Sequence, residues 1–170
     1  MVPFEWLSSP KIVIDSLESC FNNAKDKKFH VVDFGSGSSL LAIKLLRTNP
    51  RHVDKVSNID YNAKALGVAL NNMSDDDQIN LAQGKIKCHC INLARSFTAE
   101  QYEMILKHKN HHACPVLVLD KSTLDCFLAT PNIKRSGART NLPYFDAATM
   151  LYNVHTTLTY AVKFWEENTQ

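Results

Sequence analysis

The sequence predicts an α/β fold in which helices cover both faces of a doubly wound, mainly parallel sheet. Three observations favour this fold: short apolar runs typical of buried parallel strands, amphipathic helical stretches between them, and a glycine-rich turn directly after the first run. The chain has 170 residues, of which 45% are hydrophobic. This length suits one domain spanning residues 1–170 and is too short for two full domains.

In the first half of the chain, helical and strand patterns alternate. Apolar residues recur at helical spacing after Pro10, and the first buried strand follows a charged break. Asn62 is in position to cap a helix, whereas the polar segment 74–78 is expected to be a loop. The expected elements are a helix carrying 13–24, a strand at 29–34, a helix at 40–47, a strand at 56–60 and a helix carrying 66–73.

The second half continues the alternation. Residues 85–91 alternate in polarity, with Ile86, Cys88 and Cys90 on one side, which predicts a half-buried strand. Thr98 and Gln101 have the spacing of a capping box at the start of a helix. The remaining expected elements are a strand at 116–119, a short helix at 123–129, a basic loop at 130–143 and a helix with an apolar stripe over 151–165.

Charge and cysteine content limit the function classes. Nineteen basic and 17 acidic residues give a net charge of +2, so no strong field attracts nucleic acid or anionic lipid. No run of 18 apolar residues is present, which argues against a membrane protein, and no targeting segment is recognisable at the start. Five cysteines, an odd number, indicate free thiols in a reducing compartment. We therefore expect a cytoplasmic protein, with the mitochondrion as the alternative location.

The glycine-rich turn after the first strand is the main candidate for a binding site. Gly35 and Gly37 allow the backbone to approach a ligand closely, and such strand–turn–helix segments bind nucleotides in doubly wound folds. Asp60 ends the next expected strand, where a carboxylate can accept hydrogen bonds from both ribose hydroxyls. A tight turn without a ligand is the alternative interpretation of the glycines.

Two further residues indicate which nucleotide would fit. Leu40 occupies the third position of a G-x-G-x-x-G pattern, so the helix is not suited to the close approach of a diphosphate. Asp33 precedes the glycines and would repel a diphosphate but attract a cationic or amino-acid-like ligand. S-adenosylmethionine, which has a ribose, a sulfonium and an ammonium group, therefore fits better than a nicotinamide dinucleotide.

These segments resemble a known family. Residues 31–39 (VVDFGSGSS) and 57–61 (SNIDY) resemble the first two motifs of the seven-strand, Rossmann-like methyltransferases that use S-adenosylmethionine. Residues 118–125 (VLDKSTLD) are similar to the LDKGTLD segment of one subfamily, and residues 3–6 (PFEW) are similar to a segment before its first helix. That subfamily includes protein-lysine methyltransferases acting on translation elongation factor 1A and on citrate synthase.

The resemblance implies a role for each matching residue. Gly35 and Gly37 would line the methionine part of the cofactor, Asp33 would contact its amino end, and Asp60 would hold the ribose. The implied cofactor-binding set is Asp33, Gly35, Ser36, Gly37, Asp60, Tyr61, Asn92 and Asp120, with Asn92 in the position of the acid that usually meets the adenine amine.

The resemblance also implies that Asp120, at the carboxyl end of the strand at 116–119, would face the transferable methyl group, which makes it the catalytic candidate. Asp125 or Tyr144 would assist it in steering the acceptor amine. The alternative is that Asp120 caps the next helix or pairs with Lys121. The resemblance implies that the protein methylates a protein lysine. The alternatives are a catalytically inactive binding module and an RNA methyltransferase.

The chain also departs from this family. Relatives continue with three further strands after the last long helix, so the sheet here is expected to lack strands five to seven. The strand at 116–119 would then have an open edge for a partner or a second copy, unless the chain is a truncated product or an inactive relative. The segment Cys88-His89-Cys90 does not have the spacing of a structural zinc site, and no metal is expected.

Overall fold

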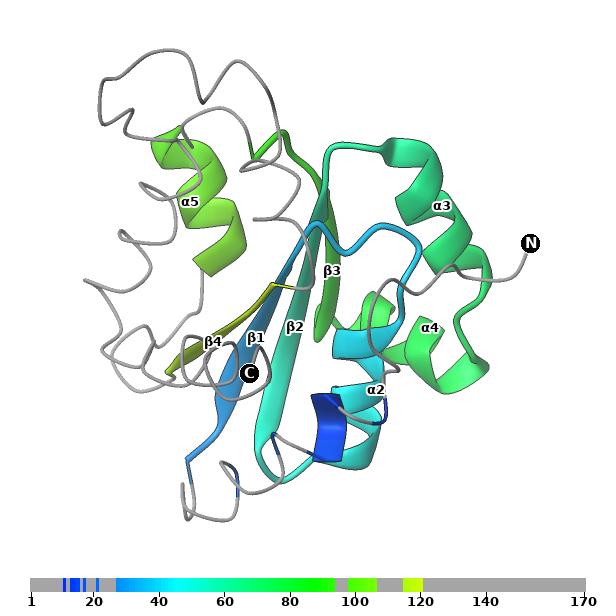
Figure 1. The fold of residues 1–170 in the computed structure, drawn as a ribbon, viewed down its shortest axis with the longest axis vertical. Helices are drawn as coiled ribbons and strands as arrows, with labels where there is room; N and C mark the ends of the chain where they lie inside the picture. Colours follow the sequence, from blue (N-terminus) through cyan, green and yellow to red (C-terminus); the bar gives the residue numbers. More distant parts are fainter. Residues whose placement is uncertain are drawn as a thin grey trace, which may run out of the picture.

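The computed structural model describes residues 11, 13–15, 17, 21, 27–93, 98–106 and 115–120. Within these residues the chain forms four strands and four labelled helices (Figure 1). Their bounds are β1 Phe29–Phe34, α2 Leu41–Thr48, β2 Val53–Asp60, α3 Ala63–Asn71, α4 Asp75–Ala82, β3 Ile86–Cys90, α5 Ala99–Leu106 and β4 Val116–Asp120.

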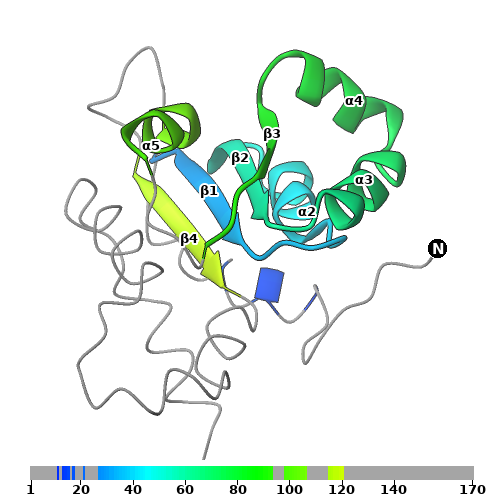
Figure 2. The same ribbon diagram turned by 90° about the horizontal axis from the view of Figure 1, so that it is seen from above.

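The four strands make one parallel sheet in the order β3-β2-β1-β4. In Figures 1 and 2, α5 lies on one face of this sheet, and α2, α3 and α4 lie toward the other. Neighbouring parallel strands need a long crossover connection, which is usually a helix that packs on a face of the sheet. The alternation of strand and helix patterns in the sequence therefore leads to this layered arrangement. The predicted Rossmann-like α/β fold is confirmed.

Apolar packing on the two faces holds the sheet between the helices. One cluster joins β1, β2 and β3 to α2, whose residues Leu41, Ile43 and Leu45 are buried. The second cluster joins Val32 and Phe34 of β1 to Ile105 of α5 and to residues of β2 and β4. Burying each large aliphatic side chain contributes about 1.5–3 kcal/mol, so both faces of β1 are held strongly in place.

Two helix starts have the predicted caps. The side chain of Asn62 accepts hydrogen bonds from the backbone N–H groups of Lys64 (3.1 Å) and Ala65 (3.3 Å) at the start of α3. At α5, the backbone N–H of Gln101 donates to Thr98 Oγ1, and Gln101 Oε1 accepts from the N–H of Thr98, both at 3.1 Å. These contacts satisfy backbone donors that have no partner inside a helix.

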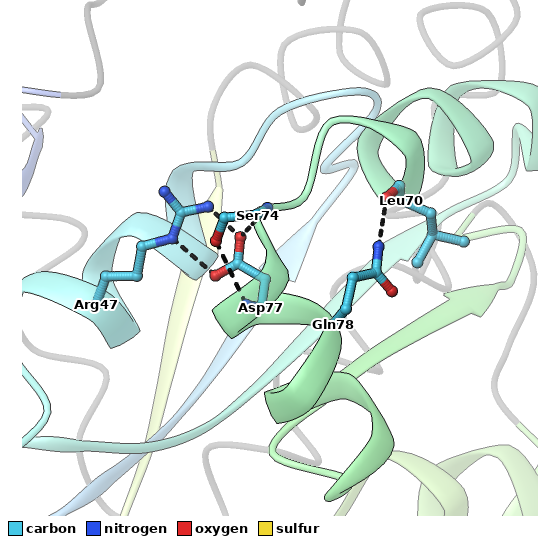
Figure 3. Close-up of polar contacts among 5 residues, drawn as sticks. All are labelled: Arg47, Leu70, Ser74, Asp77 and Gln78. Carbon is cyan, nitrogen blue, oxygen red and sulfur yellow. Dashed lines mark hydrogen bonds and ion pairs between the residues drawn. The ribbon is translucent and has the colours of Figure 1, made fainter.

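The segment 74–78 is not the loop expected from its polarity. Instead, Ser74 is the N-cap of α4, and Asp77 completes a capping box with it (Figure 3). The N–H of Ser74 donates to Asp77 Oδ2 at 2.9 Å, and Ser74 Oγ accepts the N–H of Asp77 at 3.4 Å. Aspartate is unfavourable inside helices but favourable in the first turn, which explains why a run of three aspartates here begins a helix.

An ion pair attaches α4 to α2. Arg47 Nε donates to Asp77 Oδ1 at 2.7 Å, and a second guanidinium nitrogen donates to Oδ2 (Figure 3). Asp77 is completely buried. Burial disfavours its ionised form, but the hydrogen bonds from Arg47 and Ser74 outweigh this and lower the pKa of Asp77. The pair therefore holds a charged carboxylate inside the domain.

Other differences from the predicted elements are small. The second strand begins at Val53, three residues before its predicted start. On β3, Ile86 and His89 are buried while Cys90 is exposed, so the alternation is only partial. No helix in the described ranges is long and apolar enough to cross a bilayer. The elements expected after residue 120, and the open edge that a partner or second copy would cover, stay predictions because residues 121–170 lie outside the described part.

Candidate functional site

The predicted site residues gather at one end of the sheet, where parallel strands terminate. Asp60 ends β2, Asp120 ends β4, and the glycine turn follows β1. Strand β1 has β2 on one side and β4 on the other, so the chain reverses its direction of travel across the sheet at β1. Ligands of doubly wound folds bind outside the carboxyl ends of the strands at such a switch point.

The glycine turn is tied to the end of β2 by its backbone. The N–H groups of Gly35 (2.8 Å) and Ser36 (3.1 Å) both donate to the carbonyl of Ile59. Gly35 and Gly37 have φ values of +65° and +56°, a left-handed conformation that side chains disfavour. The glycines are therefore required by backbone conformation, and the turn is fixed in place before any ligand binds.

Asp60 connects the glycine turn to β2. Its carboxylate accepts hydrogen bonds from the backbone N–H groups of Gly37 (Oδ2) and Asn62 (Oδ1), each at 2.8 Å. The residue is 6% exposed, so the carboxylate is both oriented and largely withdrawn from water. Each carboxylate oxygen retains a further acceptor position, which a ligand hydroxyl can use.

A row of buried polar side chains lies below the turn. Asp33 on β1 and Asn58 on β2 are register partners, so their side chains leave the sheet on the same face. Asp33 is 3% exposed, and Asn58 is fully buried with no hydrogen-bond partner for either amide atom among the described residues. Within the same ranges the buried hydroxyl of Ser36 also lacks a partner. Unsatisfied buried polar atoms are rare in proteins, and these two residues have theirs close to where the glycine turn meets the sheet.

Asn58 is a residue that the sequence interpretation missed. It is a polar residue within the buried part of β2 and stands two positions before Asp60, so the two-residue period of a strand places both on one face. An amide inside a buried strand was the available signal.

The outer rim of the site is formed by the residues after β2 and β3. Tyr61 is 73% exposed and follows Asp60 directly. The Cys90 thiol donates to the carbonyl of Tyr61 at 3.5 Å, and the N–H of Ile91 donates to the carbonyl of Asp60 at 2.9 Å. Asn92 is exposed just beyond this link. An exposed tyrosine and an exposed asparagine thus follow the joined ends of β2 and β3.

Asp120 stands at the other side of the switch point. It is half-buried and pairs in register with Phe34, the last residue of β1 before the glycine turn. Its place at the carboxyl end of β4 agrees with the prediction, while its catalytic role is untested. Asp125, Tyr144 and Lys121 lie outside the described residues.

The Cys-His-Cys segment does not form a metal centre in the described ranges, where no group of three potential ligands is close enough to hold an ion. Strand alternation sends His89 to the face opposite Cys88 and Cys90. Burial raises the pKa of Cys88, and burial together with the charge of Lys87 lowers the pKa of His89. The thiol and the imidazole are therefore both favoured in their neutral forms.

The family follows from comparison with known proteins. A family model described as the methyltransferase small domain matches residues 13–115. The chain belongs to this family. The matched range contains β1, the glycine turn, Asp60 and Asn92, so membership confirms the predicted methyltransferase family and supports S-adenosylmethionine as its cofactor.

Several solved methyltransferases resemble this methyltransferase domain. A methyltransferase dependent on S-adenosylmethionine from Clostridium acetobutylicum shares 12% identity with a TM-score of 0.39, covering 54% of this chain and 33% of its own. The plantazolicin methyltransferase BpumL, crystallised with a desmethylPZN analogue and S-adenosylhomocysteine (SAH), shares 11% identity with a TM-score of 0.40, covering 84% of this chain and 57% of its own. A candidate RNA methyltransferase from Pyrococcus horikoshii shares 15% identity with a TM-score of 0.38, covering 74% of this chain and 63% of its own.

The chain spans less than two thirds of the length of these structures. Because the TM-scores are below 0.5, the fold assignment rests on strand order and on the family match instead. No curated protein matches the chain significantly.

Proposed function

We propose that this methyltransferase domain binds S-adenosylmethionine at the carboxyl ends of β1, β2 and β4 and transfers its methyl group to a lysine amine of a protein. The observation that carries the proposal is the contact between the Gly37 N–H and the Asp60 carboxylate. This hydrogen bond connects two features of the site. One is the glycine backbone, which a ligand can approach closely, and the other is a carboxylate oriented to accept from a pair of hydroxyls.

The described residues suit the chemical groups of this cofactor. Asp60 would accept from the ribose hydroxyls, and Tyr61 would pack its exposed ring against the adenine. Asp33 would attract the ammonium group at the other end of the cofactor. The unpartnered hydroxyl of Ser36 supplies a donor for the carboxylate at that same end. Asn92 would accept from the adenine amine through its amide oxygen.

When bound, the cofactor supplies a methyl group on a sulfonium, which leaves as a neutral thioether. The protein must hold an uncharged amine in line with that methyl group and exclude water. Asp120, at the end of β4, would accept a hydrogen bond from the amine and so orient its lone pair. The bond from nitrogen to the methyl carbon would form as the bond from sulfur breaks, and the extra proton on nitrogen would pass to solvent.

The choice of a lysine acceptor rests on the sequence around Asp120. The segment 118–125 is similar to the LDKGTLD motif of lysine methyltransferases. A net charge of +2 provides little attraction for RNA, whose phosphates dominate affinity in RNA-binding proteins. An RNA acceptor and a catalytically inactive domain are therefore outcomes of the test below.

Cofactor binding is tested by calorimetry with SAH. We expect Asp60→Ala to weaken binding about 100-fold, the loss of two hydrogen bonds to a charged group. Asp54→Ala is the matched control, because Asp54 lies at the opposite end of β2 and faces Lys28 at the surface. The control should bind like the wild type. Absence of binding to the wild-type chain at millimolar SAH would contradict the proposal.

Transfer is tested with the cofactor carrying a labelled methyl group and a cell lysate depleted of small molecules. We expect label in protein, removed by protease, recovered as methyl-lysine and absent with Asp120→Asn. Label that ribonuclease removes would favour the RNA alternative. Tight binding of SAH without any transfer would identify a binding module.

A further inference from the structure

The buried amide of Asn58 is not explained by the fold. It is fully buried, and in the part of the chain that the structure describes neither its oxygen nor its nitrogen has a hydrogen-bond partner. Leaving such a group unsatisfied opposes folding, and an apolar residue of the same size would avoid the cost. The adjacent residue of the same strand, Ser57, is equally buried but is paired with His30 Nε2 at 2.9 Å. On the opposite face, His89 Nε2 also lacks a partner among the described residues, but Asn58 lacks one at both of its amide atoms.

The surroundings of Asn58 connect it to the proposed cofactor site. It is the register partner of Asp33 on β1, and it stands two residues before Asp60 on the same face of β2. Register neighbours in a sheet are about 5 Å apart, so a rotation of the Asn58 side chain brings its amide nitrogen to the Asp33 carboxylate. A carboxylate has about four acceptor positions, so Asp33 can accept this bond in addition to its other contacts.

We propose that Asn58 is a positioning residue that acts through Asp33: when the cofactor binds, the Asn58 amide N–H donates to the Asp33 carboxylate and aims that carboxylate at the ammonium group of the cofactor. The inference rests on the proposed function. Asn58 is too deeply buried to touch the ligand. Its effect is therefore confined to the amino-acid end of the cofactor, whereas Asp60 acts on the ribose.

Two ligands separate the ends of the cofactor. SAH has both the nucleoside and the amino-acid end, whereas 5′-methylthioadenosine has the nucleoside and lacks the ammonium and carboxylate groups. For Asn58→Leu we expect the affinity for SAH to fall about tenfold, the effect of one hydrogen bond to a charged group. Affinity for 5′-methylthioadenosine should stay within about twofold, and the melting temperature should not decrease, since an unsatisfied amide is removed. Asn58→Ala repeats the measurement if the leucine variant does not fold.

A double-mutant cycle tests whether Asn58 acts through Asp33. In an Asp33→Asn background, Asn58→Leu should cause no further loss of SAH affinity, because the carboxylate that it positions is absent. Ser57→Ala is the matched control on the opposite face of the same strand. It breaks the bond to His30, so it should lower the melting temperature and leave the ratio of the two affinities unchanged.

The outcomes distinguish this inference from the proposed function. Equal loss of both affinities in Asn58→Leu, no loss of either, or an undiminished effect in the Asp33→Asn background would overturn the positioning role alone. Failure of the wild-type chain to bind either ligand would overturn the cofactor site and the positioning role together. A selective loss of SAH affinity that disappears in the double variant supports both.

Discussion

At the scale of single residues, backbone conformation accounts for the glycine turn. Gly37 has a φ of +56°, and a Cβ placed there would lie 4.0 Å from Asp60 Oδ2, which is ordinary contact distance. Space therefore does not demand glycine at this position, but the left-handed conformation does. The same conformation points the Gly37 N–H at Asp60.

We predict that Gly37→Ala destabilises the domain by about 1–2 kcal/mol, the cost of holding a side chain in this conformation. SAH affinity should fall as well, because relief of the strain moves the N–H away from Asp60. The control is Gly67→Ala in α3, where nothing lies within 4 Å of the added carbon. There the same change should stabilise by up to about 1 kcal/mol. Denaturant unfolding measures both, and an unchanged midpoint for Gly37→Ala would refute the strain argument.

His89 illustrates how burial at one residue makes stability depend on pH. Its pKa is lowered by burial and by Lys87, so the unfolded chain binds a proton more readily than the folded one. Stability should therefore be unaffected by this group well above pH 6.5 and should fall as the pH drops below that value. The effect is isolated by comparing the free energy of unfolding of His89→Gln with that of the wild type between about pH 5 and 8, the range in which histidine titrates. A constant difference across that range would contradict it.

At the scale of elements, α4 depends on side-chain contacts that its own sequence does not predict. Asp77 caps the helix through Ser74 and pairs with Arg47 of α2. A short helix with exposed acidic residues is marginal by itself, so attachment to a neighbour stabilises it. Gln78 adds a further link by donating from Nε2 to the Leu70 carbonyl of α3 at 3.0 Å (Figure 3).

We predict that Arg47→Ala destabilises the domain by about 3 kcal/mol, because it leaves the buried Asp77 carboxylate without its ion pair. Asp77→Ala should cost less, about 1–3 kcal/mol, since Arg47 can turn to solvent while a cap and a charged hydrogen bond are lost. The neighbouring Asp75→Ala is the control, because Asp75 is exposed and, unlike Asp76, does not add to the electrostatic stabilisation of Arg47. Thermal unfolding ranks the variants, and an Arg47 variant as stable as the control would contradict the prediction.

The same pair has a signature in acid. The pKa of Asp77 is held below its ordinary value, so its contribution is present at neutral pH and lost as the pH falls through the ordinary value and then the lowered one. The difference between wild type and Asp77→Ala should therefore shrink as the solution is acidified.

At the scale of the whole molecule, β1 is the structural centre. It pairs with β2 and β4, and its two faces belong to the two apolar clusters. Elements buried on both faces and bonded on both edges open only when the domain unfolds as a whole. The glycine turn extends from this most constrained strand, which gives a binding loop a rigid base.

We predict that amide hydrogen exchange is slowest in β1 and β2 and faster in β3, which has one neighbour among the described strands. Binding of SAH should slow exchange further at residues 35–37 and 60–62, where backbone N–H groups contact Asp60 or Ile59. Mass spectrometry of peptide fragments measures this. Protection by SAH confined to α4 would place the site elsewhere.

Much of this arrangement is predictable from local sequence. The strands at 29–34 and 116–119 are apolar runs, the caps at Asn62 and Thr98 are short-range patterns, and the glycines precede a helix. The helix beginning at Asp75 was missed because three consecutive acidic residues favour a loop unless a cap and an ion pair are present. Arg47, which supplies that pair, is thirty residues away from Asp77.

The sequence by itself determined the α/β class, the position of the glycine turn and the identity of the carboxylate that ends the second strand. Only the tertiary structure decided that the Gly37 N–H meets Asp60, that Asp77 is buried against Arg47, and that Asn58 lies beside Asp33 without a partner. The reason is physical. Local propensities act over a few residues, whereas these contacts depend on strand register and helix packing, which are set only when distant segments bury their apolar faces together.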